Sequence, residues 1–342
     1  MTTSTAFGNT TTRFFYELTP EKILDSVEAL GLECTGRVLQ LNSMENRVFE
    51  VEVEIEDQST ITSPSDKFRV VKFYRPGRWS KEQILEEHSF LLDLEENEVP
   101  VIAPLKFENQ TVHEIKDLGI YYTLFPKMGG RNPDEFSKEQ LTQLGRLLGR
   151  MHNVGKLRVA KHRISLTPET YGLQNLNFIL SSGTIPKNFA DRYKIIVEEI
   201  CTISNRLFEG VTLQRIHGDC HMGNLLWGSK GPFWVDFDDM VNGPAVQDMW
   251  LIVPGRDAES KDKLDALIAG YDQMSDFNKS TLSLIEPLRA LRFIHFAAWI
   301  AKRWEDPSFK KVFTDFGSER YWQEQVVDLS GQLELIRDGS QY

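Results

Sequence analysis

Three polar side chains with short, fixed spacing form the part of this sequence best suited to catalysis. Asn224 follows Asp219 by five residues, and Asp236 ends an apolar stretch a little further on. Phosphoryl transfer from ATP needs an acceptor hydroxyl oriented by a carboxylate, and metal ions that neutralise the phosphates. We interpret Asp219 as the carboxylate that faces the hydroxyl, and Asn224 and Asp236 as oxygen ligands of the kind that Mg²⁺ prefers. The spacing therefore predicts an ATP- and magnesium-dependent phosphotransferase.

Other interpretations of the same segment stay open. His217, Cys220 and His221 carry atoms that zinc binds, although three donors within five residues lack the usual spacing and the sequence has no second cluster. The two aspartates of the motif could instead cap turns. Asp238 and Asp239 are either solvated or structural, or they contact the metal ligands rather than the metal itself. We expect His217 to shape the loop through a hydrogen bond rather than to act as a base.

A lysine within an apolar strand is the candidate for binding the nucleotide phosphates. Lys72 lies between Val71 and Phe73, where a charged residue is unexpected. A strand lysine usually lies on an exposed face. Together with the downstream loop, however, Lys72 fits the cation that a nucleotide kinase places on the α- and β-phosphates. The predicted helix that follows offers Glu86 and Glu87 as the carboxylate that would hold this lysine in place.

The loop before the lysine strand departs from the usual kinase pattern. No glycine-rich loop is found there, and residues 41–46 read Leu-Asn-Ser-Met-Glu-Asn. Small polar residues can still present backbone N–H groups, and here the Ser43 hydroxyl, to a phosphate. An ordinary polar turn is the alternative. We also expect backbone groups of residues 124–126 to meet the adenine ring.

The first third of the chain is predicted to be rich in strands. Its expected elements, in chain order, are a helix over residues 20–30, strands over 47–56 and 68–74 joined by the polar hairpin loop 57–67, and a helix over 80–96. Thr19 would cap the first of these helices, with Pro20 at its first position. Ser80 would begin the second, with Gln83 in its first turn.

The remainder of the chain is predicted to be mostly helical. Its expected helices are 137–154, 188–208, 261–275, 278–304 and 317–337, and its only convincing strands, 225–227 and 233–237, flank the catalytic motif. Glycine and proline make residues 127–133 the best boundary between the two parts. We therefore predict an α+β protein with a small β-rich N-lobe (1–125), a linker (126–133) and a larger helical C-lobe (134–342).

Composition excludes several classes of function. Among 342 residues the net charge is −11, which disfavours nucleic acid as a partner because phosphate backbones bind to basic surfaces. No apolar run approaches the roughly 20 residues that span a membrane. Residues 1–13 are interpreted as a frayed tail without a signal-peptide core, and three scattered cysteines do not form a disulfide framework. A cytoplasmic location is expected.

The motif segments resemble the catalytic loop and metal-binding motif of protein kinases. His-Gly-Asp stands for His-Arg-Asp, and Asp-Phe-Asp stands for Asp-Phe-Gly. The chain as a whole is similar to the aminoglycoside/choline-kinase-like superfamily and, within it, to bacterial kinases of the stress response kinase A type. The strings that carry this similarity are residues 41–48, 71–76, 83–88, 217–221, 242–248 and 285–290. The similarity extends from about residue 18 to residue 322.

This resemblance implies a bilobal protein-kinase-like fold and a cytoplasmic, monomeric Ser/Thr protein kinase of stress responses. By motif position it assigns Asp219 as proton acceptor, Asn224 and Asp236 as Mg²⁺ ligands, Asp236 also as catalytic, and Ser43 and Lys72 as ATP contacts. It favours Glu87 over Glu86, because Glu87 lies thirteen residues before Pro100, as the corresponding glutamate does in similar kinases. Loop 57–67 is longer than the family's hairpin at that place.

The sequence predicts the acceptor of the phosphoryl group less directly than it predicts the reaction. Pro244 follows Asp236 by only eight residues, which leaves no room for the long activation segment with which protein kinases bind peptides. This spacing favours a small hydroxylated acceptor, whereas the resemblance favours a protein Ser/Thr acceptor. A nucleotide-binding pseudokinase is a third alternative, against which the joint presence of Lys72, Asp219 and both metal-ligand candidates argues.

Overall fold

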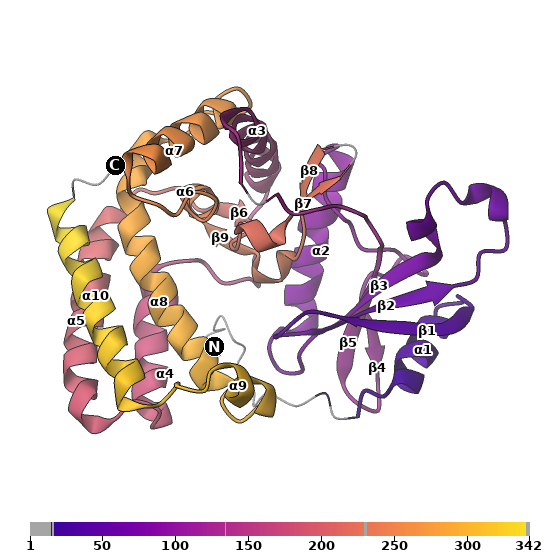
Figure 1. Ribbon diagram of the computed structural model, residues 1–342, viewed down its shortest axis with the longest axis horizontal. Helices are drawn as coiled ribbons and strands as arrows, with labels where there is room; N and C mark the ends of the chain where they lie inside the picture. The colour runs from indigo at the N-terminus through magenta and orange to yellow at the C-terminus, as the bar shows by residue number, and fades with distance from the viewer. Residues whose placement is uncertain (1–14, 16, 134, 229–230, 340–342) are drawn as a thin grey trace. The chain divides into compact units, whose positions relative to one another are not determined.

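The computed structural model describes residues 15, 17–133, 135–228 and 231–339, which form two compact units (Figure 1). The strand-rich unit consists of the described residues up to 133 together with 223–238. The helical unit consists of residues 135–222 and 239–339. The segment 223–238 thus returns to the strand-rich unit late in the sequence. The lobe boundaries predicted above stay a prediction, and residues 1–13 lie outside the described residues.

A five-stranded antiparallel sheet with strand order β1-β2-β3-β5-β4 forms the centre of the strand-rich unit. Its strands are β1 (Cys34–Leu41), β2 (Arg47–Val53), β3 (Phe68–Phe73), β4 (His113–Ile115) and β5 (Ile120–Pro126). The predicted hairpin of β2 and β3 is confirmed, although β2 ends at Val53 rather than at residue 56. Strand β1 was not predicted, since its side chains are mostly exposed and show no clear alternation.

The two faces of this sheet contact different helices. Val51, Val71 and Leu124 point to one face and form a buried core with α1 (Pro20–Glu28). Because side chains alternate along a strand, Lys72 points to the other face. There it meets α2 (Lys81–Glu96). The alternation that builds the core therefore also directs the lysine towards α2.

The caps predicted for these two helices are confirmed. The Thr19 side chain accepts the N–H of Lys22, and a proline begins α1. Ser80 and Gln83 form a reciprocal capping box at the start of α2. Such a box satisfies two backbone N–H groups that the first turn leaves without helical partners. It fixes where α2 starts, and so which of its side chains face the sheet.

Helices dominate the other unit. They are α3 (Lys138–Gly155), α4 (Gln174–Ser182), α5 (Lys187–Leu207), α6 (Val246–Trp250), α7 (Ala258–Tyr271), α8 (Ile285–Lys302), α9 (Pro307–Val312) and α10 (Glu319–Asp338). Helix α3 packs on α7, α5 on α10, and α4 on α8 (Figure 1). The first pair approaches closely at two glycines. A Cβ atom at Gly145 or Gly270 would lie 2.0 Å from a carbonyl oxygen of the facing helix.

Several predictions for this half of the chain were wrong in detail. The single helix expected over 278–304 is a 3-10 turn, Lys279–Leu284, followed by α8. Pro287 explains the break, because proline has no N–H and fits an α-helix only in its first turn. The π-helical turn Pro168–Leu173 and α4 were not predicted. Neither were the short paired strands β6 (Gln214–Ile216) and β9 (Val241–Gly243).

The sequence predicts no apolar run long enough to span a membrane. No helix within the described part of the chain combines the length and the apolar character needed to cross a bilayer.

Candidate active site

A short hairpin places Asn224 and Asp236 beside each other. Strands β7 (Leu225–Gly228) and β8 (Gly231–Trp234) are antiparallel, and the Val235 N–H donates to the Asn224 carbonyl oxygen at 2.9 Å. Asp236 has a φ of 62°, in the left-handed region that few residues other than glycine adopt. This conformation ends the extended chain, which is why the strand predicted to residue 237 stops at Trp234.

These two side chains have the chemistry of a magnesium site. The Asp236 side chain is 54% exposed, whereas its neighbours Phe237 and Asp238 are buried. An amide oxygen and an exposed carboxylate are hard ligands, and Mg²⁺ usually takes one or two such protein ligands with waters and phosphate oxygens. The residues present therefore fit the ion that the sequence predicts.

Lys72 lies next to the same hairpin. Its Nζ is 3.0 Å from Asp238 Oδ1, 3.3 Å from Glu87 Oε1 and 3.5 Å from Asp236 Oδ1. Burial alone would lower the pKa of Lys72, but the Asp238 and Glu87 carboxylates outweigh it and raise this pKa well above its usual range. The lysine is therefore a permanent cation, held between α2 and the turn after β8.

Between the two candidate glutamates, the structure brings Glu87 to the lysine. Glu87 is 1% exposed and points at the sheet, whereas Glu86 lies at the partly exposed edge of α2. One turn further along α2, the ring of Phe90 packs edge-on against Phe237, with 5.9 Å between ring centres. Helix α2 thus contacts both the lysine and the segment that carries Asp236.

Asp238 is not solvated. Its side chain is 4% exposed and forms ion pairs with Lys72 and with Arg78. Arg78 also lies 3.7 Å from Glu45, whose carboxylate is 3.3 Å from Arg75. Buried and partly buried charges thus alternate in sign along a continuous series that we call the charge chain. Its members are Arg75, Glu45, Arg78, Asp238, Lys72 and Glu87.

The charge chain reaches the loop that replaces a glycine-rich loop. Arg75 donates from Nε to the Glu45 carbonyl oxygen at 2.8 Å and from Nη2 to the Met44 carbonyl oxygen at 3.2 Å. Its backbone N–H donates to Asn46 Oδ1 at 3.1 Å. The partly exposed Ser43 lies in this loop, between β1 and β2. Side-chain hydrogen bonds thus hold the loop in a defined conformation.

The catalytic-loop candidate Asp219 lies in the helical unit, where Asp248 holds the backbone before it. The Asp248 carboxylate accepts the N–H groups of His217 and Gly218, each at 2.9 Å. It also contacts His152 Nε2 at 3.1 Å. Asp248 is fully buried at the start of the helical segment after β9. One buried carboxylate therefore fixes two successive peptide groups ahead of Asp219.

Gly218 makes the turn that this loop requires. Its φ is +85°, and a Cβ atom at this position would lie 2.4 Å from the Asp239 carbonyl oxygen. The next N–H, that of Asp219, donates to His217 Nδ1 at 3.2 Å. This hydrogen bond agrees with the loop-shaping role expected of His217. Within the described residues, no group of three or more His, Cys, Asp or Glu side chains is placed to hold a metal, so the zinc alternative has no support.

Two side chains contact the Asp219 carboxylate. Arg292 Nη1 of α8 is 2.9 Å from Oδ1, and His221 Nε2 is 3.2 Å from Oδ2. Burial by itself would raise the pKa of Asp219, but the His221 hydrogen bond and the Arg292 charge hold this pKa well below its usual range. Asp219 is therefore ionised under all ordinary conditions.

The structure places the predicted residues in both units. Lys72, Glu87, Asn224 and Asp236 come together in the strand-rich unit, which also contains the Ser43 loop, whereas Asp219 belongs to the helical unit. Sequence reasoning missed the contributions of Glu45, Arg75, Arg78, Asp248 and Arg292. Glu45, Arg75 and Asp248 lie within the strings that carry the family resemblance. Arg78 and Arg292 each lie two residues beyond one of these strings, and no motif marks them.

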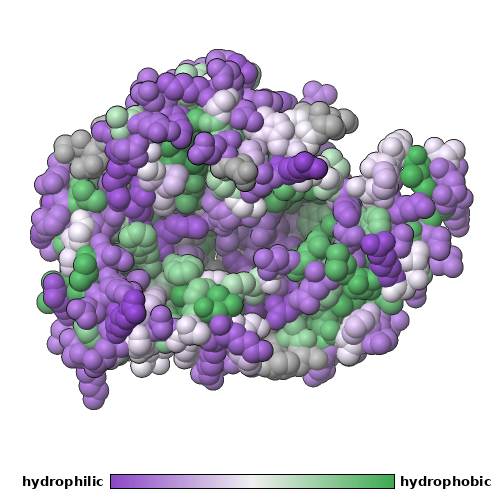
Figure 2. All heavy atoms as spheres, viewed as in Figure 1, coloured by the Kyte–Doolittle hydropathy of each residue, from purple (hydrophilic) through white to green (hydrophobic). Residues whose placement is uncertain are grey.

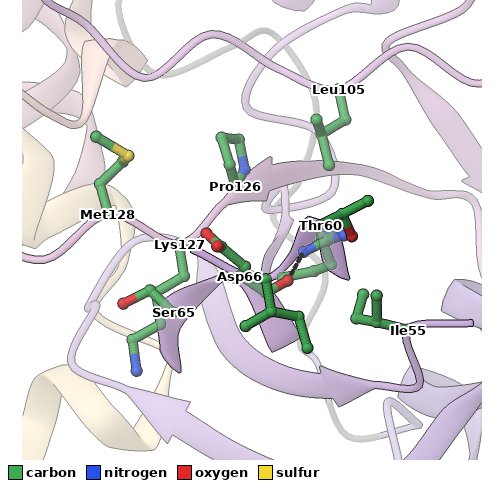
Figure 3. Close-up of a pocket in the computed structure, with 10 residues that line it drawn as sticks. Ile55, Thr60, Ser65, Asp66, Leu105, Pro126, Lys127 and Met128 are labelled. Atoms are coloured by element: carbon green, nitrogen blue, oxygen red, sulfur yellow. Dashed lines mark hydrogen bonds between the residues drawn. The ribbon is translucent and has the colours of Figure 1, made fainter. Parts of the chain in front are cut away.

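A pocket of about 300 Å³ lies elsewhere in the strand-rich unit. Figure 3 shows it between Thr60 and Asp66 of the loop after β2 and Pro126 at the end of β5. Arg69 also lines it, and an odd number of residues separates Arg69 from Lys72 on β3. The two side chains therefore point to opposite faces of the sheet. This pocket is not on the lysine side, and the expectation that residues 124–126 meet adenine stays a prediction.

Comparison with known proteins identifies the family. A model of the phosphotransferase enzyme family matches residues 40–285. Stress response kinase A of Escherichia coli (strain K12) is 38% identical over 326 residues, covering 95% of both chains. The chain belongs to the phosphotransferase enzyme family. The matched range includes Ser43, Lys72, Asp219 and both metal-ligand candidates of this phosphotransferase.

Two further relatives agree with this assignment. A serine/threonine protein kinase named RdoA from Salmonella typhimurium (strain LT2) is 37% identical over 327 residues, covering 95% of both chains. The structure of an amicoumacin kinase in complex with AMP-PNP and Ca²⁺ superposes with a TM-score of 0.66 over 94% of both chains, at 18% identity. The resemblance to stress response kinase A and the α+β kinase-like fold are thereby confirmed. The protein is an ATP-dependent kinase.

Proposed function

We propose that this phosphotransferase transfers the γ-phosphoryl group of ATP to a Ser or Thr hydroxyl of a protein, with Mg²⁺ as its metal. The observation that carries the proposal is the position of Lys72, a buried cation bracketed by Glu87 and the exposed carboxylate of Asp236. A cation fixed by a helix carboxylate beside a metal ligand is the arrangement that phosphoryl transfer requires. The relative named as a Ser/Thr protein kinase supports the protein acceptor.

Each nucleotide-side residue has a role that its surroundings support. Lys72 binds the α- and β-phosphates, and Glu87 keeps its ammonium group in position. Asn224 and Asp236 would hold Mg²⁺, which supplies charge neutralisation for the phosphates when bound. Ser43 contacts the phosphates from a loop that Arg75 holds in place. A loop fixed in advance loses less conformational entropy when the nucleotide binds.

Asp219 orients the acceptor hydroxyl and accepts its proton. An ionised carboxylate accepts hydrogen bonds only, so it suits an O–H donor. The lowered pKa of Asp219, caused by His221 and Arg292, makes it a weak base. This is compatible with the reaction, because a loose phosphoryl-transfer transition state asks more for orientation than for early proton removal.

A small hydroxylated acceptor is the second candidate, and the short segment after Asp236 favours it. The chain passes from Asp236 through one 3-10 turn, Phe237–Asp239, directly into β9 at Val241. No peptide-binding activation segment fits between these two elements. The amicoumacin kinase of the same fold is named for a small molecule. We further propose a role in stress responses, which the name of the Escherichia coli relative suggests. We also propose that the protein is a cytoplasmic monomer.

A labelled-phosphate assay tests the proposal. The protein is incubated with γ-labelled ATP and Mg²⁺, with and without myelin basic protein, next to the Asp219→Asn variant. We expect label on the protein acceptor for the wild type and none for the variant, which should still bind ATP because base and nucleotide contacts are separate groups.

Other outcomes identify the alternatives. Label only on an added choline or amino sugar supports the small-molecule acceptor. Thermal stabilisation by ATP without transfer to any acceptor indicates a nucleotide-binding regulator. Full activity of Asp219→Asn on myelin basic protein contradicts the role given to Asp219.

A further inference from the structure

The exposed face of α8 continues directly from the Asp219 carboxylate. Arg292 touches Asp219 from this helix. Residues 285–291 and 297–298 of α8 are buried, whereas Arg292, Phe293, His295, Phe296 and Trp299 are partly or fully exposed. Positions three, four and seven apart lie on one helix face. Arg292, His295, Phe296 and Trp299 therefore form one surface, which we call the α8 face.

The α8 face combines one cation with aromatic rings. His295 stacks on Tyr171 with 4.2 Å between ring centres and 14° between ring planes. Phe296, which is 46% exposed, contacts Trp299 and Phe313. Tyr171 comes from a π-helical turn, a distortion found frequently at functional sites. Figure 2 shows hydrophobic residues gathered over part of α8 amid a mostly hydrophilic surface.

Arg292 is not needed to hold the catalytic loop. The loop backbone is already fixed by Asp248, by His217 and by the turn at Gly218. What Arg292 contacts is the side-chain carboxylate of Asp219, and its own side chain remains 40% exposed. A guanidinium has five N–H donors in a planar fork. It can therefore keep Asp219 and bind a second carboxylate at the same time.

We infer that the α8 face recognises a peptide acceptor that carries an acidic residue next to its Ser or Thr and a bulky apolar residue two or three positions further along. This inference rests on the proposed protein Ser/Thr kinase function. The acidic side chain would pair with Arg292, and the apolar side chain would pack on Phe296 and Trp299.

Charge and length both argue for this occupant. Choline and amino sugars are cations, so they offer no carboxylate for the partly exposed guanidinium of Arg292 to bind. At 1.5 Å per residue along a helix, Phe296 lies about 6 Å and Trp299 about 10 Å beyond Arg292. An extended peptide advances about 3.3 Å per residue, so this span covers two to three residues from the one that Arg292 binds.

The inference is tested with four peptides of equal length, each with a single Ser as acceptor. They carry Asp or Lys beside this Ser, and Leu or Gln three residues further along from the charged residue. The set is made twice, once with these residues before the acceptor and once with them after it. We expect kcat/KM to favour Asp over Lys by about 2- to 5-fold, the effect of one partly exposed charge pair. Leu should be favoured over Gln by about fivefold, the effect of partial apolar burial.

Variants separate recognition from general damage. Arg292→Glu should reverse the preference to Lys, and Arg292→Lys should keep the preference for Asp. Phe296→Ser should remove only the preference for Leu, which keeps the test decisive if Arg292→Glu is inactive. Arg320→Glu makes the same charge change on α10, where Arg320 pairs with Glu324, and should leave both preferences intact.

Two results would overturn the inference, and they differ. If the peptides are phosphorylated equally, or if Arg292→Glu and Phe296→Ser keep the wild-type preferences, the α8 face does not read the acceptor, while the kinase function stands. If no peptide or protein is phosphorylated but choline or an aminoglycoside is, the proposed protein acceptor is wrong, and this inference is wrong with it.

Discussion

Removal of Arg78 should destabilise the protein far more than removal of an ordinary surface charge. Arg78 is 5% exposed and lies between Asp238 and Glu45 in the charge chain. In Arg78→Met, the buried Asp238 carboxylate loses this cation, and the other cation beside it, Lys72, is shared with Glu87. Breaking a buried ion pair by deleting one partner costs about 3–5 kcal/mol, because the other charge stays buried without compensation.

Denaturation with urea, followed by tryptophan fluorescence, measures this loss. With the entropy of unfolding expected for 342 residues, a decrease of that size in the free energy of unfolding corresponds to a fall in Tm of roughly 4–7 °C. The matched control is Lys138→Met, which removes an ion pair, 3.2 Å to Asp262, whose side chains are both about two-thirds exposed. Exposed pairs contribute about 1 kcal/mol or less. The control should therefore unfold almost like the wild type.

A double variant tests the mechanism itself. Arg78→Met combined with Asp238→Asn removes the stranded charge, so it should recover part of the lost stability relative to Arg78→Met alone. The stability losses caused by substitutions within one ion-pair network do not add up. We therefore expect the double variant to lose less stability than the sum of the two single variants. Equal stability of Arg78→Met and Lys138→Met, or no recovery in the double variant, would refute the reasoning from buried charge.

Three further predictions concern the catalytic residues. Gly218→Ala should lower the free energy of unfolding by about 1–3 kcal/mol, because Gly218 has a positive φ and the new Cβ would lie 2.4 Å from a carbonyl oxygen. The control Gly331→Ala places its Cβ in open space and should leave the free energy of unfolding unchanged. Asp236→Asn should raise the Mg²⁺ concentration for half-maximal activity about tenfold or more; an unchanged titration contradicts the ligand assignment. Folding lowers the pKa of Asp219, so the ionised Asp219 carboxylate stabilises the folded protein above about pH 4. This contribution fades as the pH falls below that value. Arg292→Met should therefore reduce the free energy of unfolding at neutral pH, with the deficit shrinking in acid; a deficit independent of pH would exclude this linkage.

Local patterns in the sequence predicted much of the fold and the identity of the site residues. Alternation predicted β2, and the capping residues Thr19 and Ser80 gave the starts of α1 and α2, since each of these depends on neighbouring residues only. The apolar neighbours of Lys72, taken together with the downstream catalytic loop, made it a functional candidate. Its contact with Glu87, which the resemblance favoured, follows from the register of a capped helix against a strand.

Pairings between distant residues could not be predicted in this way. Arg78 and Asp238 are separated by 160 residues, and neither sequence environment shows that the other exists. The same holds for Arg292 and Asp219, which meet only because of how α8 packs in the helical unit. The strand end at Trp234 also depends on the left-handed backbone of Asp236. An aspartate in the sequence predicts that conformation less strongly than a glycine would.

The late return of residues 223–238 to the strand-rich unit has a practical consequence for dissecting this kinase. A fragment that ends near residue 133 would contain Lys72, Arg75 and Arg78 but, of the acidic partners, only Glu45 and Glu87. It would bury an uncompensated positive charge where Asp238 normally sits, and its sheet should not fold stably alone. Joining residues 223–238, which include Asp238, to such a fragment through a designed connection should restore the missing counter-charge. Complementation by that short segment is therefore the natural way to study nucleotide binding in isolation.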